Sequence, residues 1–108
     1  MTKHDYIEAT VCAFYGIKPD QIKTGFRFEE YLLPRQMTIY LVNEFSDRID
    51  KSAVMARYCL KRATFYNCIK SIDGRRKNTA FESQYLKIRG IVEIGLMYSD
   101  SNCPYYAI

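Results

Sequence analysis

Apolar positions recur at helical spacing along most of the chain. Near its start, Ile7, Val11 and Phe14 follow the i, i+4, i+7 rule, which predicts an amphipathic first helix over about residues 3–15. Gly16 follows directly and tolerates the left-handed conformation in which helices commonly end. We therefore expect the first helix to stop there.

A proline sets the start expected for the central helix. Pro34 lacks an N–H and its φ is already helical, so it suits the first turn of a helix. We expect a short helical turn at residues 19–23, a loop, and then a helix from near Leu33 to near Phe45. Its apolar residues share one face: Met37, Tyr40, Leu41 and Phe45. Arg35 would lie in the first turn, where it can reach an anion beside the positive end of the helix dipole.

Two short helices joined by a tight turn are expected next. The first covers about residues 51–58, with Asp50 as its N-cap, and the second covers about residues 61–72. The turn at Cys59-Leu60 lacks the glycine often found in a helix-turn-helix. The inward residues of the second helix are Phe65, Cys68, Ile69 and Ile72. Its outward residues are Arg62, Tyr66, Asn67 and Lys70. The pair is a helix-turn-helix candidate, with a plain pair of packed helices as the alternative.

A basic loop separates this pair from the last helix. The loop covers residues 73–78, with Gly74 as its stop signal, and a helix over about residues 79–97 follows. Its inward stripe consists of Phe81, Tyr85, Ile88 and Val92. Residues 98–108 form an apolar tail. Together these elements predict an all-α fold, a compact bundle of five to six helices containing a helix-turn-helix, in one domain over residues 1–108.

Composition narrows the classes of function. Hydrophobic residues make up 48% of the chain and charged residues 26%, as in folded soluble proteins. No stretch approaches the roughly 20 apolar residues that span a bilayer, and there is no signal-peptide core, so we expect a cytoplasmic protein with no membrane contact. The four cysteines form no CxxC pair and His4 is the single histidine, so we expect free buried thiols and no metal site. No catalytic motif is present, and we expect no enzyme activity, cofactor or small-molecule substrate.

Positive charge is concentrated in one part of the chain. Residues 1–59 carry eight basic and eight acidic side chains, whereas residues 60–90 carry eight basic and two acidic ones, a net charge of +6. Concentrated Lys and Arg favour binding to a polyanion, because they release condensed counterions from phosphates. A solubilising surface is the alternative explanation.

In this order, the elements resemble the C-terminal DNA-binding domain of the bacterial replication initiator DnaA, a Trp-repressor-like helix-turn-helix domain. The resemblance covers about residues 6–92, and its strongest match is the segment PRQMTIYLVNEF. VCAFYGIKPDQIK is similar to the family's opening helix and short second turn, and VMARYCLKRATFYNCIKSI occupies the place of the helix-turn-helix. The resemblance implies a small replication- or transcription-associated or phage-like protein that binds double-stranded DNA. The ATPase phosphate loop GxxxxGK[ST] of the initiator is missing.

The resemblance also implies roles for particular residues. Arg27 stands where the family places a minor-groove arginine before its PRQ helix, and residues 61–64 stand where the family carries its Asp-His-Thr/Ser-Thr signature. Only Thr64 matches that signature in type. Together with the exposed basic and polar positions, the expected DNA contacts are Arg27, Arg35, Lys61, Arg62, Thr64, Tyr66, Asn67, Lys70, Arg75, Arg76 and Lys77.

Two departures from the family keep a second function open. The changed signature argues against recognition of the family's usual origin box, because base readout depends on the donor and acceptor at each position. Glu29 and Glu30 also stand where the family tends to be basic. The alternative is a protein-interaction module, with a protein partner or a homodimer, that keeps the fold but has lost its DNA contacts.

Overall fold

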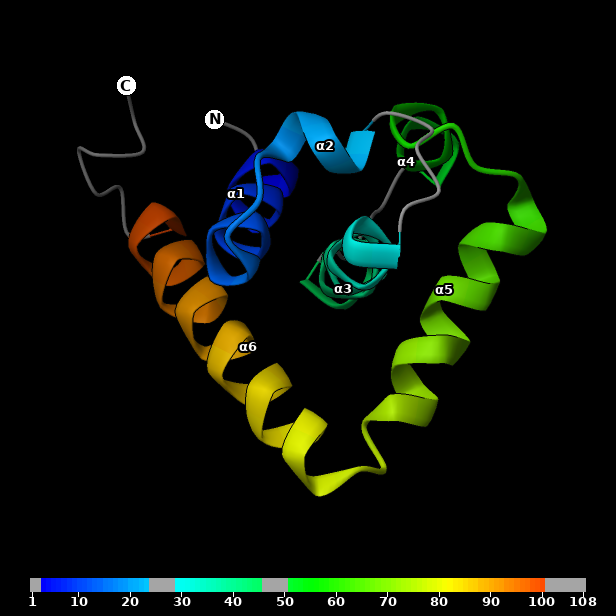
Figure 1. Cartoon of the computed structure of the whole chain (residues 1–108). Coiled ribbons are helices and arrows are strands. Elements are labelled where there is room, and N and C mark those ends of the chain that lie inside the picture. The colour runs from blue at the N-terminus through cyan, green and yellow to red at the C-terminus, as the bar shows by residue number, and fades with distance from the viewer. Residues whose placement is uncertain (1–2, 24–28, 46–50, 101–108) are drawn as a thin grey trace.

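Six α-helices make up the part of the chain that the computed structural model describes, residues 3–23, 29–45 and 51–100, and no β-strand occurs among these residues. The helices are α1 (Lys3–Tyr15), α2 (Pro19–Lys23), α3 (Glu29–Phe45), α4 (Lys51–Arg57), α5 (Arg62–Arg75) and α6 (Thr79–Asp100). The prediction of an all-α bundle is confirmed. In Figure 1, α5 and α6 form the two arms of a V, with α3 between them and α1 beside α6.

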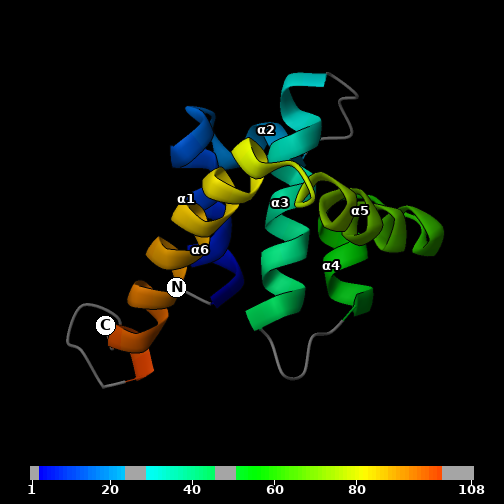
Figure 2. The same cartoon turned by 90° about the horizontal axis from the view of Figure 1, so that it is seen from below.

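Helix α3 is the centre of the core. It packs on α1, α2 and α5, and in Figure 2 it stands between the α1–α6 side and the α4–α5 side of the molecule. Its buried residues occur on more than one face: Pro34, Arg35, Met37, Thr38, Ile39, Leu41 and Val42. The hydroxyl of Thr38 donates to the carbonyl of Pro34 over 2.9 Å, so this buried polar group is satisfied. The buried surface of α3 is therefore wider than the single apolar stripe that the sequence predicted.

The predicted start of α3 near Leu33 is wrong, because the helix begins at Glu29. Pro34 therefore lies in its second turn, where it has no N–H to donate to the carbonyl four residues earlier. The extra turn is held by Tyr31, whose ring packs against the core and whose hydroxyl accepts a hydrogen bond from the Gln21 amide at 2.9 Å. Tertiary packing has overridden the local preference of proline.

Helix α1 ends as predicted, and two of the three residues predicted to face inward, Ile7 and Val11, are fully buried. Gly16 has a φ of +71°. The N–H of Ile17 donates to the carbonyl of Cys12 at 2.9 Å, and the N–H of Gly16 donates to the carbonyl of Ala13 at 3.2 Å. This hydrogen-bond pair is the Schellman ending of a helix. The prediction that Phe14 faces inward is wrong, since Phe14 is 39% exposed. Glu8 and Cys12 complete the buried face beside Ile7 and Val11.

The corner between α5 and α6 is shorter than expected. Gly74 does not stop α5, because the helix continues through Arg75 and the N–H of Arg76 still donates to the carbonyl of Ile72 at 2.9 Å. The predicted loop over residues 73–78 therefore shrinks to residues 76–78. Asn78 then caps α6, since its side-chain oxygen accepts from the N–H of Phe81 at 3.1 Å.

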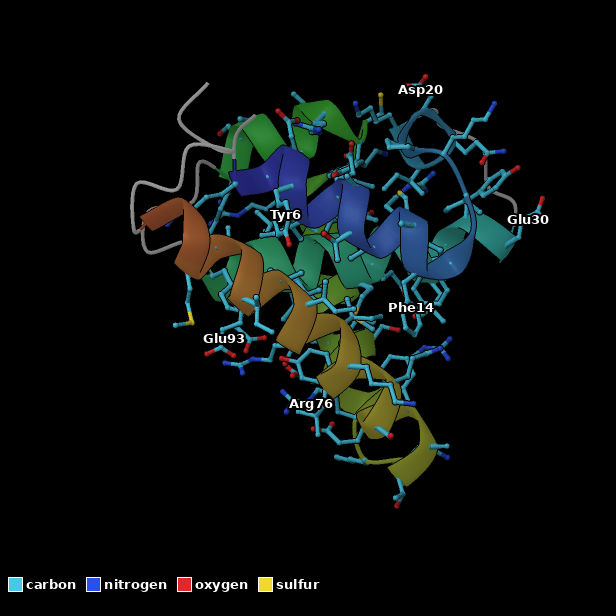
Figure 3. The ribbon with its side chains drawn as sticks, turned by 90° about the vertical axis from the view of Figure 1, so that its left-hand side faces the viewer. Tyr6, Phe14, Asp20, Glu30, Arg76 and Glu93 are labelled. Carbon is cyan, nitrogen blue, oxygen red and sulfur yellow. The ribbon has the colours of Figure 1, made fainter. Side chains whose placement is uncertain are left out.

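Helix α6 buries the predicted stripe and runs further than predicted. Tyr85, Ile88 and Val92 are fully buried, and the helix extends to Asp100, so the first three residues of the predicted tail are helical. Residues 101–108 lie outside the described part of the chain. Where α1 crosses α6, the Tyr6 ring lies against Gly95, and its hydroxyl donates to the carbonyl of Ile91 at 3.2 Å (Figure 3).

Candidate nucleic-acid interface

Helix α5 has one buried face and one exposed face, as the sequence predicted. Phe65, Cys68 and Ile72 are buried and Ile69 is partly buried. The outward face of α5 consists of exposed side chains: Arg62, Tyr66, Asn67 and Lys70. Ala63 and Thr64 are exposed as well, so the first two turns present polar and cationic side chains with one small apolar residue among them.

The turn before α5 is built on a cysteine in the conformation that glycine favours. Cys59 has a φ of 55°. The N–H of Leu60 donates to the carbonyl of Met55 at 2.8 Å, and the N–H of Cys59 donates to the carbonyl of Ala56 at 3.3 Å. This is the same Schellman pattern that ends α1. The missing glycine therefore did not prevent the turn. The prediction of buried thiols is wrong here, because Cys59 is exposed, whereas Cys12 and Cys68 are buried as free cysteines and Cys103 lies outside the described residues.

A buried carboxylate ties the end of α4 to α1. Glu8 is 2% exposed and accepts hydrogen bonds from Arg57 Nε at 3.1 Å and Nη2 at 3.0 Å, and from the hydroxyl of Tyr58 at 2.5 Å. Lys23 Nζ lies 3.3 Å from the same carboxylate. We call Glu8, Lys23, Arg57 and Tyr58 the Glu8 cluster. Burial alone would raise the pKa of Glu8, but the hydrogen bonds from Arg57 and Tyr58 outweigh burial and hold the pKa below its ordinary value. The cluster fixes the position of the turn that leads into α5.

Two cationic side chains lie close to the exposed ring of Tyr66. Lys51 Nζ, from the first residue of α4, donates to the Tyr66 hydroxyl at 3.1 Å and lies 5.2 Å from the ring centroid. The Arg62 guanidinium lies 6.0 Å from the same centroid. The hydrogen bond from Lys51 and the smaller effect of Arg62 lower the pKa of the phenol. We call these three residues the Tyr66 cluster. Sequence reasoning missed Lys51, which stands 15 residues from Tyr66, and only its place at the start of α4 could have indicated it.

The remaining predicted basic residues divide into two groups. Lys61, Lys70, Arg75 and Lys77 are exposed, and none of them makes an ion pair with an acidic side chain in the described ranges. Lys61 is the N-cap residue of α5, and Arg75 is its last residue. A helix of 14 residues is about 21 Å long, so unpaired cations stand at both ends of α5.

Arg76 belongs to the other group, because its donors are engaged by other side chains of the same chain. Its Nε and Nη2 contact Glu82 at 2.9 and 3.0 Å, and its Nη1 donates to the hydroxyl of Tyr40 at 3.0 Å. The guanidinium also lies 4.2 Å from the centroid of the Tyr85 ring. In Figure 3, Arg76 lies close to α6. Arg76 thus joins α3 and α6 at the corner, and a DNA contact for it stays a prediction.

Arg35 does not lie at a helix N-terminus, contrary to the prediction. It is 7% exposed, and its Nε donates to the carbonyl of Ile22 at 2.8 Å. That carbonyl belongs to the last turn of α2, where helices leave acceptors without intrahelical partners. Arg35 therefore holds α2 against α3, and we omit it from the interface. Arg27 and Asp50 lie outside the described residues.

Two other kinds of feature are absent from the described ranges. Within them, no group of three His, Cys, Asp or Glu side chains could hold a metal ion, and no helix is long and apolar enough to cross a membrane. A shallow hollow of about 310 Å³ lies at the α5–α6 corner. Its lining residues are Asp73, Arg76, Lys77 and Glu82, whose charges balance.

Comparison with known proteins adds no assignment. No protein-family model matches the sequence, and it has no significant similarity to a curated protein or to a solved structure. The resemblance to the DnaA domain therefore continues to rest on the segments quoted above.

Proposed function

We propose that this chain binds double-stranded DNA, with α5 in the major groove and the corner at residues 75–77 against the backbone. The observation that carries the proposal is the distribution of cations. Arg57, Arg76 and Arg89 are held in internal ion pairs, whereas the cations along α5 face solvent without an acidic partner among the described residues. Unpaired cations on one exposed helix match the electrostatic footprint of a DNA-binding surface.

The dimensions of α5 also suit this role. The major groove of B-DNA is about 12 Å wide and admits an α-helix, while α5 is about 21 Å long with cations at both ends. In this arrangement Lys61 and Arg62 contact phosphates of one DNA strand, and Arg75 and Lys77 contact phosphates of the other strand. Thr64, Asn67 and Lys70 then face base edges, where amide, hydroxyl and ammonium groups can read donors and acceptors.

Fluorescence anisotropy on random duplex DNA at two salt concentrations tests this function. We expect affinity to fall steeply with salt, because each phosphate contact contributes about 0.9 to the log–log slope. Replacing Arg62, Lys70 and Arg75 with alanine should lower affinity by more than about 100-fold near 0.1 M salt and, because two of the three contact phosphates, reduce the slope by about two.

A second triple variant is the matched control. Alanine at the exposed Lys3, Lys18 and Lys87 removes the same charge from other parts of the chain. It should keep most of the affinity. Equal losses in both variants would show that net charge alone drives binding, and no binding of the unmodified chain at low salt would reject the proposal.

The outer face of α6 favours a second candidate function, a protein-interaction module formed by two copies of this chain. Leu86, Ile94 and Met97 are 52, 57 and 63% exposed on one side of the helix. Leu86 and Ile94 stand four residues to either side of Gly90, so an antiparallel pair of α6 helices would place each Leu86 beside the other copy's Ile94.

Multi-angle light scattering over a range of concentrations distinguishes the two functions. Self-association should persist in the Arg62, Lys70 and Arg75 variant and should be abolished by Ile94→Asp, which places a charge in the apolar contact. A monomer at every concentration would exclude this second function.

A further inference from the structure

The Tyr66 cluster brings two like charges to one exposed phenol. Lys51 comes from the start of α4 and Arg62 from the start of α5, on opposite sides of the turn. Both lie within 6.0 Å of the Tyr66 ring centroid. Both cations lower the pKa of the same phenol, so two positive charges that repel each other act at one place, and no acidic side chain of the described residues makes an ion pair with either cation. An anion at this place would relieve the repulsion.

The geometry of the cluster suits an oxyanion. The charged groups of Lys51 and Arg62 lie beside the Tyr66 ring, and the Tyr66 hydroxyl is free to donate because the hydrogen bond from Lys51 uses the oxygen as an acceptor. The ammonium group, the guanidinium and the phenolic O–H are therefore available to the oxygens of one ligand. Charge-assisted hydrogen bonds of this kind are the strongest that a protein makes to a phosphate.

We propose that Lys51, Arg62 and Tyr66 form a phosphate-binding site that spans the turn between α4 and α5. The inference rests on the proposed function, in which the ligand is one backbone phosphate of the DNA. The site takes one donor from α4 and two from α5. It therefore fixes the orientation of both helices on the backbone, and this contact sets how α5 enters the groove. Lys51 and Tyr66 act on all DNA sequences alike.

DNA binding by single variants is the first test. Lys51→Gln should reduce the log–log salt slope by at most about 0.9, because it removes one of the two cations that contact this phosphate. Tyr66→Phe keeps the ring and removes the hydroxyl, and it should weaken binding about three- to ten-fold on every duplex tested. Lys87→Gln, at an exposed lysine of α6, is the control and should change neither quantity.

Titration of the Tyr66 phenol is the second test, and it does not require DNA. The difference in near-ultraviolet absorbance between the unmodified chain and Tyr66→Phe isolates this phenol over about pH 8 to 11. Inorganic phosphate, added at constant ionic strength with chloride as the reference, should raise the pKa of Tyr66. The Lys51→Gln variant should show a smaller rise.

The two tests separate the failure of this inference from the failure of the proposed function. DNA binding that depends on Lys70 and Arg75 but ignores Lys51→Gln and Tyr66→Phe would overturn the site and leave the function intact. If the unmodified chain fails to bind DNA, a phosphate-dependent pKa would support the site with free phosphate as its ligand. Absence of that pKa change as well would overturn the site.

Discussion

Cys59 adopts the only positive φ of a non-glycine residue among those described, 55°, in the turn before α5. An L-residue in this conformation costs about 1–2 kcal/mol, because its Cβ crowds the following carbonyl oxygen. Glycine avoids that cost but loses about 0.5–1 kcal/mol of backbone entropy on folding. We therefore expect Cys59→Gly to raise the free energy of unfolding by about 1 kcal/mol.

Urea denaturation measures this change. Cys59→Ala is the control, because alanine removes the thiol but keeps the Cβ, and it should bring no gain. A stability of Cys59→Gly equal to that of Cys59→Ala would show that the turn carries no backbone strain.

Single functional residues were harder to predict than buried ones, because the sequence gives no tertiary partners. The outward positions of α5 followed from its periodicity. Arg35 was misplaced, since nothing near it in the sequence shows that the Ile22 carbonyl needs a donor. Lys51 was missed because its contact with Tyr66 exists only after α4 and α5 have packed. Arg76 is a predicted DNA contact whose ion pair with Glu82 the sequence does not show.

At the scale of elements, the crossing of α1 and α6 depends on one glycine. A Cβ on Gly95 would lie 1.9 Å from the Tyr6 hydroxyl oxygen, whereas a Cβ on Gly90 meets no atom within 4 Å. We expect Gly95→Ala to lower the free energy of unfolding by about 1–3 kcal/mol, because the ring of Tyr6 must leave its place against α6.

Gly90→Ala is the matched substitution on the same helix. It should raise the free energy of unfolding by about 0.5–1 kcal/mol through helix propensity alone. Thermal or urea denaturation of both variants checks the pair. A gain from both substitutions would mean that α1 and α6 do not approach closely at residue 95.

Helices with one buried face were predicted well, and helices with several neighbours were not. The inward stripes of α5 and α6 are those expected from periodicity, because each helix buries one side. Helix α3 packs against α1, α2 and α5, so its buried positions follow no single stripe. It also begins four residues before the predicted start. In α1 the predicted stripe is correct at Ile7 and Val11 and wrong only at Phe14, near the end of the helix, because Cys12 rather than Phe14 continues the buried face.

At the scale of the whole molecule, the Glu8 cluster links the N-terminal helix to the α4–α5 unit and makes stability depend on pH. Burial lowers the pKa of His4, which hydrogen-bonds Tyr58 at 2.7 Å, and hydrogen bonds from Arg57 and Tyr58 hold the pKa of Glu8 low. Both groups bind protons more readily in the unfolded chain, so acid favours unfolding. Stability should therefore fall below about pH 6.5 through His4, and again below about pH 4.5 through Glu8.

Urea denaturation across this range tests the assignment with two variants. His4→Gln should remove the decrease that begins near pH 6.5, since His4 is the single histidine of the chain. Glu8→Gln should cost about 2–3 kcal/mol at neutral pH, because Arg57 loses a buried partner, and should flatten the decrease at lower pH. An unchanged pH profile in both variants would place the acid sensitivity elsewhere.

The separation of the two faces of α5 has a consequence for how this chain can diversify. Core contacts use Phe65, Cys68 and Ile72, while Ala63, Thr64, Asn67 and Lys70 are exposed to solvent. The exposed positions can therefore be randomised together without disturbing the packing that defines the fold. A library varied at these four positions, selected on immobilised duplexes, would yield a set of binders with different preferences on one unchanged scaffold.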